Sequence, residues 1–370
     1  MKKDVVTVMD FGSSKITVLS GVIEVNKTFK LLASADCDYE GFVNGEFVDP
    51  NNLKNAIVSA ISSVEKQLNF KINNIFVGVP AEFCFVKENI ITKLFPKKTK
   101  LTYKNITNLF LEDTEFNEYE SHSIINKAPL YYIVNDENKT NDPIGFIANK
   151  IQVRCGYVLV ENKFKLLVSG LLESLDIKEF DFVSNTLAES TYLINEDVRN
   201  EGAILIDCGY ITTSVSQVLG DGLCNMKSFS SGGGFIISDL SKILEISLDE
   251  AEELKRKIVI TLRPSGVDFY TLSNGKKLSV KVVNEIVLTR LDKIVETIKK
   301  CIDSFELKLP DYLPLYFTGG GINYIEGITD YLRKQFSRQV ELLSPKALLY
   351  KKPDLSSSIS LLNMTINLFK

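Results

Sequence analysis

Two segments of the chain repeat one arrangement of residues that suits phosphate binding. Each has an apolar run, then Asp-x-Gly, then small hydroxyl residues and a second apolar run, at residues 8–18 and 205–215. This pattern predicts two strands joined by a tight polar turn. Glycine lets the backbone approach a ligand closely, and the amides and hydroxyls of the turn can face phosphate oxygens. Asp10 and Asp207 could each hold a metal ion or its waters beside those phosphates.

A glycine-rich turn follows later in the chain. An apolar strand at 315–318 runs into Gly319, Gly320 and Gly321, and an amphipathic stretch occupies 325–336. A strand, a glycine-rich turn and a helix N-terminus together form an arrangement that binds anions or nucleosides. A single Asp-x-Gly turn or a single glycine loop is usually only a turn. Two such hairpins and a glycine turn in this order predict a duplicated fold that clamps a nucleotide between its halves.

Composition limits the classes of function. With 370 residues, 45% of them apolar and 24% charged, the chain is long enough for two or more domains with sizeable cores. A net charge of −4 argues against broad nucleic-acid binding. The six cysteines form no CxxC pair and are expected to be reduced, as in a cytoplasmic protein. His122 is the only histidine, which argues against histidine-based catalysis and His-rich zinc sites, and we expect it at the surface. No signal peptide and no apolar run of membrane-spanning length is expected.

The elements that must position the turns follow from hydrophobic periodicity. The spacing predicts helices at 53–68, 161–175, 187–195, 248–257 and 282–305, and strands at 75–79, 130–134, 151–159 and 180–183. A change in composition at about 84–160 predicts an inserted α+β subdomain, in which the basic stretch 93–104 is expected as a solvated loop or, less simply, a partner site. Polar residues 195–202 are expected to join the halves, and 262–278 to be rich in loops. The last segment, 356–369, is expected to pack back as strand or helix.

With its motifs in this order, the chain resembles the actin, sugar kinase and heat-shock chaperone superfamily. Within it, five segments resemble FtsA, a family of bacterial cell-division proteins: residues 41–49, 72–80, 142–146, 231–234 and 247–255. The resemblance covers nearly the whole chain. It implies an α/β, actin-like ATPase fold, with two duplicated α/β lobes and an FtsA-type inserted α+β subdomain.

The resemblance implies a division into four subdomains. They are IA at 1–84, 161–200 and 337–370, the inserted IC at 85–160, IIA at 201–240 and 286–336, and IIB at 241–285.

The resemblance also implies that ATP and Mg²⁺ bind between the lobes. The implied phosphate ligands are Asp10, Gly12, Ser13, Ser14, Lys15, Asp207, Gly209, Thr212 and Thr213, with Asp10 and Asp207 holding Mg²⁺ through water. The rest of the implied cofactor-binding set is Gly232, Gly233, Gly319, Gly320, Gly321 and Asn323, with Glu252 and Lys255 near the ribose or base. Two alternatives stay open: Lys15 is a solvated turn lysine, and Glu252 and Lys255 form an exposed i,i+3 pair.

The chain departs from the family pattern at two places in the implied site. Tyr210 and Ile211 replace two glycines of the second phosphate turn, so this turn should hold phosphate less closely. Asn185 replaces the usual glutamate ahead of Leu-Ala, and an amide cannot act as a general base. Glu189, one helical turn further on, is a weak substitute. We therefore expect nucleotide binding with weak or absent hydrolysis, at most that of a poor ATPase.

A third departure is at the end of the chain. FtsA proteins typically end in a basic amphipathic helix that lies on the membrane, whereas this sequence stops at Lys370 and contains no Trp. Either the sequence is truncated, or membrane contact is indirect and comes through a partner. The expected location is the cytoplasm, with recruitment to the inner face of the cell membrane at the division site.

The resemblance implies partners as well. The family's FtsZ C-terminal peptide would dock at about 241–285, where the basic residues are Lys255, Arg256, Lys257, Arg263, Lys276 and Lys277, unless these serve only solubility. Self-association into filaments, and contacts of the inserted subdomain with other divisome membrane proteins, are further expectations. The alternative function is a PilM-like cytoplasmic scaffold of a type IV pilus or related membrane assembly. A sugar or acid kinase on the same fold ranks below both, because no catalytic aspartate for a substrate hydroxyl stands out.

Overall fold

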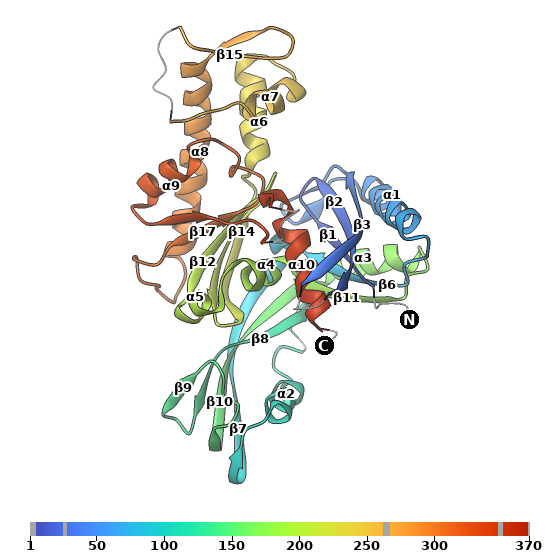
Figure 1. The fold of residues 1–370 in the computed structure, drawn as a ribbon, viewed down its shortest axis with the longest axis vertical. Coiled ribbons are helices and arrows are strands. Elements are labelled where there is room, and N and C mark those ends of the chain that lie inside the picture. Colours follow the sequence, from blue (N-terminus) through green and yellow to red (C-terminus); the bar gives the residue numbers. More distant parts are fainter. Residues whose placement is uncertain (1–4, 25–27, 118, 262–266, 347–350, 369–370) are drawn as a thin grey trace.

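The first lobe is built on a five-stranded sheet in the order β11-β6-β1-β2-β3 (Figure 1). The computed structural model describes residues 5–24, 28–117, 119–261, 267–346 and 351–368. The strands are β1 (Val6–Phe11), β2 (Lys15–Ile23), β3 (Phe29–Asp38), β6 (Asn74–Val79) and β11 (Glu179–Ser184). β1 pairs antiparallel with β2 and parallel with β6, so the first turn lies at the carboxyl end of a buried central strand. β1 is apolar on both faces because both faces are covered.

Two pairs of helices cover this sheet. They are α1 (Pro50–Leu68) and α3 (Asn162–Glu173) on one face, and α4 (Asn185–Leu193) and α10 (Ser356–Leu368) on the other. α1 begins where the Asp49 side chain accepts a hydrogen bond from the Asn51 amide, with Pro50 at the first helical position. Met9 and Phe11 face α1 and α3, whereas Val6 and Val8 face α10. The expected return of the C-terminal segment to the first lobe is confirmed, and the segment is a helix.

The second lobe repeats the first. Its sheet has the order β14-β13-β12-β17-β18, with β12 antiparallel to β13 and parallel to β17. The strands are β12 (Ala203–Cys208), β13 (Thr213–Leu219), β14 (Gly222–Phe229), β17 (Leu315–Thr318) and β18 (Val340–Leu342). They pack against α6 (Gly233–Leu244), α8 (Val280–Asp303) and α9 (Ile328–Phe336). Both predicted hairpins and the duplicated α/β fold are therefore confirmed.

The inserted subdomain is a four-stranded sheet in the order β7-β10-β8-β9, at the bottom of Figure 1. Its elements are β7 (Cys84–Lys100), α2 (Tyr103–Glu112), β8 (His122–Val134), β9 (Asn138–Thr140) and β10 (Ile147–Glu161). The prediction of a loop at 93–104 is wrong, because most of this stretch is the end of β7. All of its lysines except Lys104, which is in α2, occupy an edge strand, where charge discourages pairing with another chain. His122 is half-buried rather than a plain surface residue, since its ring packs edge-on against Phe85 at 4.5 Å.

A smaller excursion extends the second lobe at the top of Figure 1. It consists of α7 (Leu248–Lys255), β15 (Phe269–Thr271) and β16 (Lys277–Ser279), next to the ends of α6 and α8. The remaining elements are β4 (Phe42–Val43), β5 (Glu46–Phe47), α5 (Glu196–Glu201) and the 3₁₀ turns η2 (Ala81–Phe83) and η3 (Pro353–Leu355). Within the described ranges, no helix combines the length and apolar character needed to cross a membrane.

One expectation near the glycine turn needs correction. α9 begins only at Ile328, so Gly319–Gly321 do not stand at a helix N-terminus. Residues 319–327 instead form a series of turns braced by side chains. The division into four subdomains stays a prediction, although the inserted sheet itself runs from Cys84 to Glu161.

The packing of α10 gives a stability prediction. Leu361 and Leu362 are fully buried, and their side chains fill the space over Gly78 and Gly21 in the sheet. Leu361→Ala should lower the free energy of unfolding by about 2–5 kcal/mol, because it leaves a cavity between α10 and the sheet. Urea denaturation measures the change. Leu166→Ala on the exposed side of α3 is the control and should stay within roughly 0.5 kcal/mol of wild type. Equal effects of the two substitutions would contradict this packing.

Candidate functional site

The two predicted turns have the same backbone design. The first turn, residues 12–15, closes with the Gly12 amide donating to the Lys15 carbonyl at 2.9 Å. The second turn, residues 209–212, closes with the Gly209 amide donating to the Thr212 carbonyl at 2.9 Å. A Cβ on Gly12 would lie 2.9 Å from the Lys15 carbonyl oxygen, and a Cβ on Gly209 would lie 3.0 Å from the Thr212 carbonyl oxygen. These close approaches explain why both positions are glycine. The turns also touch each other, because the Ile211 amide donates to Ser13 Oγ at 3.0 Å.

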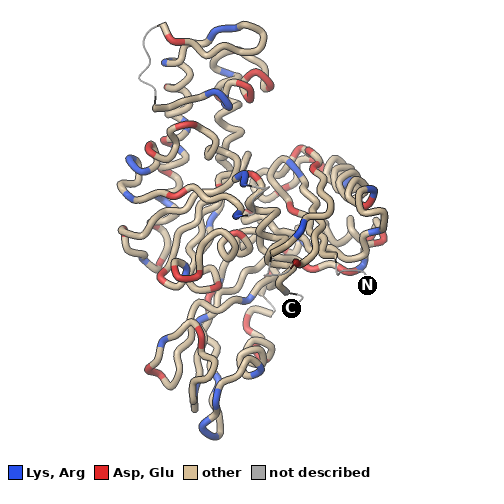
Figure 2. The backbone as a smooth tube through the Cα atoms, viewed as in Figure 1, with Lys and Arg blue, Asp and Glu red and all other residues tan. Residues whose placement is uncertain are grey.

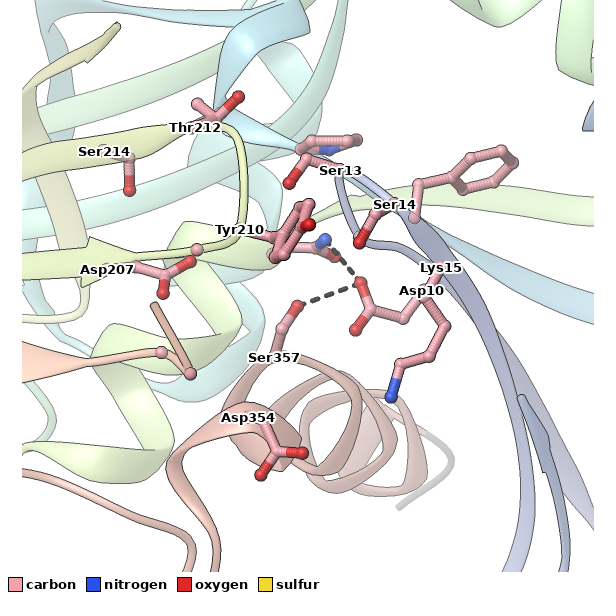
Figure 3. Close-up of a pocket in the computed structure, with 18 of the residues that line it drawn as sticks. Asp10, Ser13, Ser14, Lys15, Asp207, Tyr210, Thr212, Ser214, Asp354 and Ser357 are labelled. Atoms are coloured by element: carbon pink, nitrogen blue, oxygen red, sulfur yellow. Dashed lines mark hydrogen bonds between the residues drawn. The ribbon is translucent and has the colours of Figure 1, made fainter. Parts of the chain in front are cut away.

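A cavity of about 270 Å³ lies between the lobes beside these turns (Figure 3). Thirteen residues named from the sequence line it: Asp10, Gly12, Ser13, Ser14, Lys15, Asn185, Glu189, Asp207, Gly209, Tyr210, Thr212, Gly319 and Gly320. Lys15 also forms an ion pair with Asp36 at 3.2 Å, so its charge is shared with a carboxylate outside the cavity. The structure therefore brings the hydroxyls, glycines and carboxylates expected around phosphates to one place.

Three carboxyl groups are buried together in this cavity. Burial raises the pKa of Asp10 to about 6, against the hydrogen bonds from Ser357 and Asn185, which lower it. Burial also raises the pKa of Asp207, and the neighbouring Asp10 adds to that rise. The pKa of Glu189 is raised well above its usual value by burial and by the charges of Asp207 and Asp10. All three shifts have the same cause, since desolvation and like charges disfavour the ionised form.

Two buried acceptors in the cavity have no hydrogen-bond partner in the described part of the chain. They are Asn185 Oδ1 and Glu189 Oε1, both on α4. Asn185 Nδ2 is engaged, because it donates to Asp10 Oδ1 at 2.7 Å (Figure 3). Unsatisfied oxygens beside three carboxyls suit a bound cation, which would satisfy the oxygens and lower the pKa values. Among the described residues, no three His, Cys, Asp or Glu side chains form a ready-made metal shell, which is compatible with a Mg²⁺ that keeps several waters.

The glycine turn supports the site from the second lobe. Gly319 has φ +87°, and a Cβ there would lie 2.1 Å from Asp207 Oδ1, so only glycine allows the aspartate this position. The Gly321 amide donates to the Cys208 carbonyl at 2.7 Å, and Asn323 Nδ2 donates to the Gly319 carbonyl at 2.9 Å. Gly321 and Asn323 therefore hold the turn in place and do not line the cavity.

The remaining sequence-predicted residues also lie outside the cavity. They are Thr213, Gly232, Gly233, Glu252 and Lys255. Thr213 Oγ1 donates to the Ser231 carbonyl at 2.8 Å, and the Gly233 amide donates to the Gly209 carbonyl at 2.9 Å, so both brace the second turn. Glu252 pairs with Arg256 at 3.3 Å on α7. Lys255 is buried, and desolvation lowers its pKa.

Sequence reasoning missed five polar residues of the cavity, of which Thr186 lies next to Asn185 on α4. Ser357 Oγ, at the start of α10, donates to Asp10 Oδ1 at 3.0 Å, and Asp354 lies beside Gly320. Thr17 and Ser214 are the cross-strand partners of Asp10 and Asp207. Thr17 and Ser214 could have been found by aligning the two hairpins, since each of them stands seven residues after the aspartate of its hairpin. No signal in the sequence placed the C-terminal residues there.

Glu82 is a further missed residue, next to the cavity. It lies in η2, where the first lobe leads into the inserted sheet. Its Oε2 accepts from Thr212 Oγ1 at 2.5 Å, and its Oε1 accepts from the Gly45 amide at 2.7 Å. This carboxylate therefore ties the second turn to the first lobe.

Comparison with known proteins supports this fold. The structure is similar to a chain of the PilM–PilN type IV pilus biogenesis complex over 98% of this chain and 98% of that chain, with a TM-score of 0.66 and 14% identity. The crystal structure of MreB5 of Spiroplasma citri bound to AMPPNP matches over 100% of this chain and 97% of its own, with a TM-score of 0.58 and 11% identity. The fold is that of the actin-like ATPases, with two duplicated lobes around a cleft.

The sequence comparisons point to a more specific group of proteins than the fold does. The family model for the cell division protein FtsA matches residues 204–360. FtsA of Streptococcus pneumoniae is 24% identical over 363 residues, which is 96% of this chain and 79% of that protein. FtsA of Buchnera aphidicola from Schizaphis graminum is 21% identical over 351 residues, 91% of this chain and 84% of that protein. The chain is therefore similar to FtsA proteins over most of its length and shares the actin-like fold.

Because its carboxyls are buried, we expect the site to lower the free energy of unfolding near neutral pH. Because the folded pKa of Asp10 is about 6 and its ordinary value is 3.8, the folded state holds this proton more tightly than the unfolded state. Stability should therefore fall as the pH rises from about 4 to 6. Asp10→Asn should raise the free energy of unfolding at pH 7.5 by up to about 3 kcal/mol, with a gain that vanishes near pH 4. Urea titrations at both pH values measure this.

The control for that experiment is Asp176→Asn, whose side chain is 87% exposed and should change stability little at either pH. A loss of stability in Asp10→Asn at pH 7.5 would contradict the proposed repulsion among the buried carboxyls.

Proposed function

We propose that this chain binds ATP with Mg²⁺ in the cleft, polymerises, and acts as an adaptor in bacterial cell division. The observation that carries the nucleotide proposal is the meeting of two equivalent turns, each following a buried aspartate, at one cavity. The bound AMPPNP of the MreB5 structure supports the choice of nucleotide, since that protein shares the fold. The role in cell division follows from the FtsA matches.

The chain's residues would divide the work of binding. Ser13, Ser14 and Thr212, with the turn amides, would hold the phosphates. Asp10 and Asp207 would hold Mg²⁺ through water, with Glu189 close by. The cation would neutralise phosphate charge when bound.

We expect weak or absent hydrolysis because neither candidate for the general base, Asn185 or Glu189, is suited to that role. Asn185 is an amide that donates to Asp10 and cannot take a proton from water. Glu189 stands one helical turn beyond Asn185 on α4, so it is displaced from the position at which the family's glutamate would act.

Calorimetry tests the nucleotide proposal. Wild-type protein titrated with ATP and Mg²⁺ should give a saturable heat. Asp207→Asn should weaken that binding by about 10- to 100-fold, because it removes a charged group that faces the cation. Asp176→Asn is the control and should bind as wild type does. The same mixtures should release phosphate no faster than a no-enzyme blank. The absence of heat at millimolar ATP, or rapid phosphate release, would each contradict this part of the proposal.

The proposed partners begin with the FtsZ C-terminal peptide, docked on residues 241–285. The basic residues there are less available than the sequence suggests. Lys255 is buried, and Arg256 and Lys257 are paired with Glu252 and Glu253. Arg263 lies outside the described residues. Lys276 and Lys277, in the β15–β16 hairpin at the top of Figure 2, are exposed, with Lys276 Nζ donating to the Glu245 carbonyl at 3.4 Å, and we propose that they meet an acidic peptide.

We propose that filaments, contacts of the inserted subdomain with divisome membrane proteins, and indirect recruitment of a cytoplasmic protein to the inner membrane face complete this role. We propose no nucleic-acid partner, given the net charge of −4.

Fluorescence anisotropy with a labelled FtsZ C-terminal peptide tests the docking site. The double variant Lys276→Glu/Lys277→Glu should bind about 5- to 30-fold more weakly, because it replaces attraction with repulsion. The matched control is Lys97→Glu/Lys98→Glu, two exposed neighbours at the end of β7, which should bind as wild type does. Equal losses in both variants would point to a non-specific charge effect and contradict this docking site.

One observation favours the alternative, a PilM-like scaffold: the PilM–PilN complex shares the fold over nearly all of both chains. Pull-downs separate the two functions. Retention on the N-terminus of a pilus membrane protein, with none on the FtsZ peptide, would favour the scaffold.

A further inference from the structure

The cavity contains only part of the expected nucleotide site. The residues that line it come mainly from the two hairpins, from α4, from Gly319 and Gly320, and from residues 353–357. The residues assigned to the ribose or base, Glu252 and Lys255, lie outside it. At about 270 Å³, the cavity is also smaller than the roughly 300–1,000 Å³ of typical small-molecule sites. The cavity therefore lacks part of the space, and part of the residues, that a whole nucleotide would need.

Tyr210 stands between the residues that line the cavity and the two residues, Glu252 and Lys255, that were assigned to the ribose or base. It belongs to the second turn and lines the cavity, where Figure 3 shows its side chain among the lining residues. Its ring lies against the first turn of α6, since a Cβ on Gly234 would come within 2.8–3.0 Å of three ring atoms. Burial raises the pKa of the Tyr210 hydroxyl, and the charge of Glu252 on α7 adds to that rise, so α7 lies near the ring. The ring thus separates the phosphate end of the cleft from α7.

The backbone of Tyr210 is fixed, but its side chain is free to turn. Its carbonyl accepts from the Gly234 amide at 2.7 Å, and a Cβ on Gly232 would approach the same carbonyl within 2.6 Å. In contrast, the side chain is 44% exposed, and no hydrogen bond or ring pair within the described residues holds it. Rotation about the Cα–Cβ bond would move the ring without disturbing the turn.

We propose that the Tyr210 side chain is a gate that fills the nucleoside part of the cleft, so that a magnesium-bound polyphosphate enters freely and a nucleoside enters only when the ring rotates away. This inference rests on the proposed nucleotide function and gives that site a specificity-determining residue. If the open position of the ring has a population of about 1–10%, the apparent affinity for ATP is lowered about 10- to 100-fold, and the affinity for polyphosphate is not.

The test compares two probes on three variants by calorimetry in the presence of Mg²⁺. The probes are ATP and tripolyphosphate, and the variants are Tyr210→Ala, Tyr210→Phe and the control Tyr312→Ala, whose side chain is 78% exposed on the surface. Tyr210→Ala should bind ATP at least tenfold more tightly than wild type and should bind tripolyphosphate as wild type does. Tyr210→Phe keeps the ring and should resemble wild type, as should the control. Circular dichroism and melting temperature verify folding.

The other outcomes of this experiment would contradict the gate. If Tyr210→Ala binds ATP no more tightly than wild type, the gate is wrong and the nucleotide proposal stands. If Tyr210→Ala binds ATP more weakly, the ring is a stacking surface for the base, and the gate is again wrong. If no folded variant binds either probe, the proposed nucleotide function fails, and the gate fails with it.

Discussion

The mutual burial of Asp10, Asp207 and Glu189 is the constraint around which the cleft is arranged. Burial raises the pKa values of all three carboxyls, and the charge of Asp10 adds to the rise at Asp207 and Glu189, so the arrangement costs stability near neutral pH. Such an arrangement persists only because two rigid sheets present the aspartates at the carboxyl ends of their central strands. A cation in the cavity would relieve the repulsion, so the cleft is suited to bind one.

Contacts between the lobes hold this arrangement together. At the turns, Ser13 accepts from the Ile211 amide and Glu82 accepts from Thr212, so the first lobe grips the second turn directly. Below the cleft, Val158 of the inserted sheet shares an apolar cluster with Leu205 and other residues of the second lobe. Because Glu82 adjoins β7, a ligand that moves the second turn would also act on the base of the inserted subdomain.

The sequence predicted the parts of the site that local patterns encode. The Asp-x-Gly turns follow from strand periodicity and from the need for glycine at 12 and 209, and both hairpins were found for that reason. Ser357 and Glu82 reach the cleft only through tertiary packing, so no local pattern shows them. The helix N-terminus expected after Gly321 is wrong because residues 322–327 form turns fixed by contacts with distant segments, such as the Glu326 amide donating to the Ile258 carbonyl at 3.3 Å. The charged residues of α7 match the family pattern, but the tyrosine at 210 separates them from the cavity.

The central claim is that Asp10 and Asp207 form one cation and phosphate site across the two lobes. Anomalous diffraction from crystals grown with Mn²⁺ and a non-hydrolysable ATP analogue tests it most directly. We predict a manganese peak between the two carboxylates, with phosphate density against both turns. Well-ordered turns with no peak between them at saturating ligand, or a peak at another position, would contradict this account of the molecule.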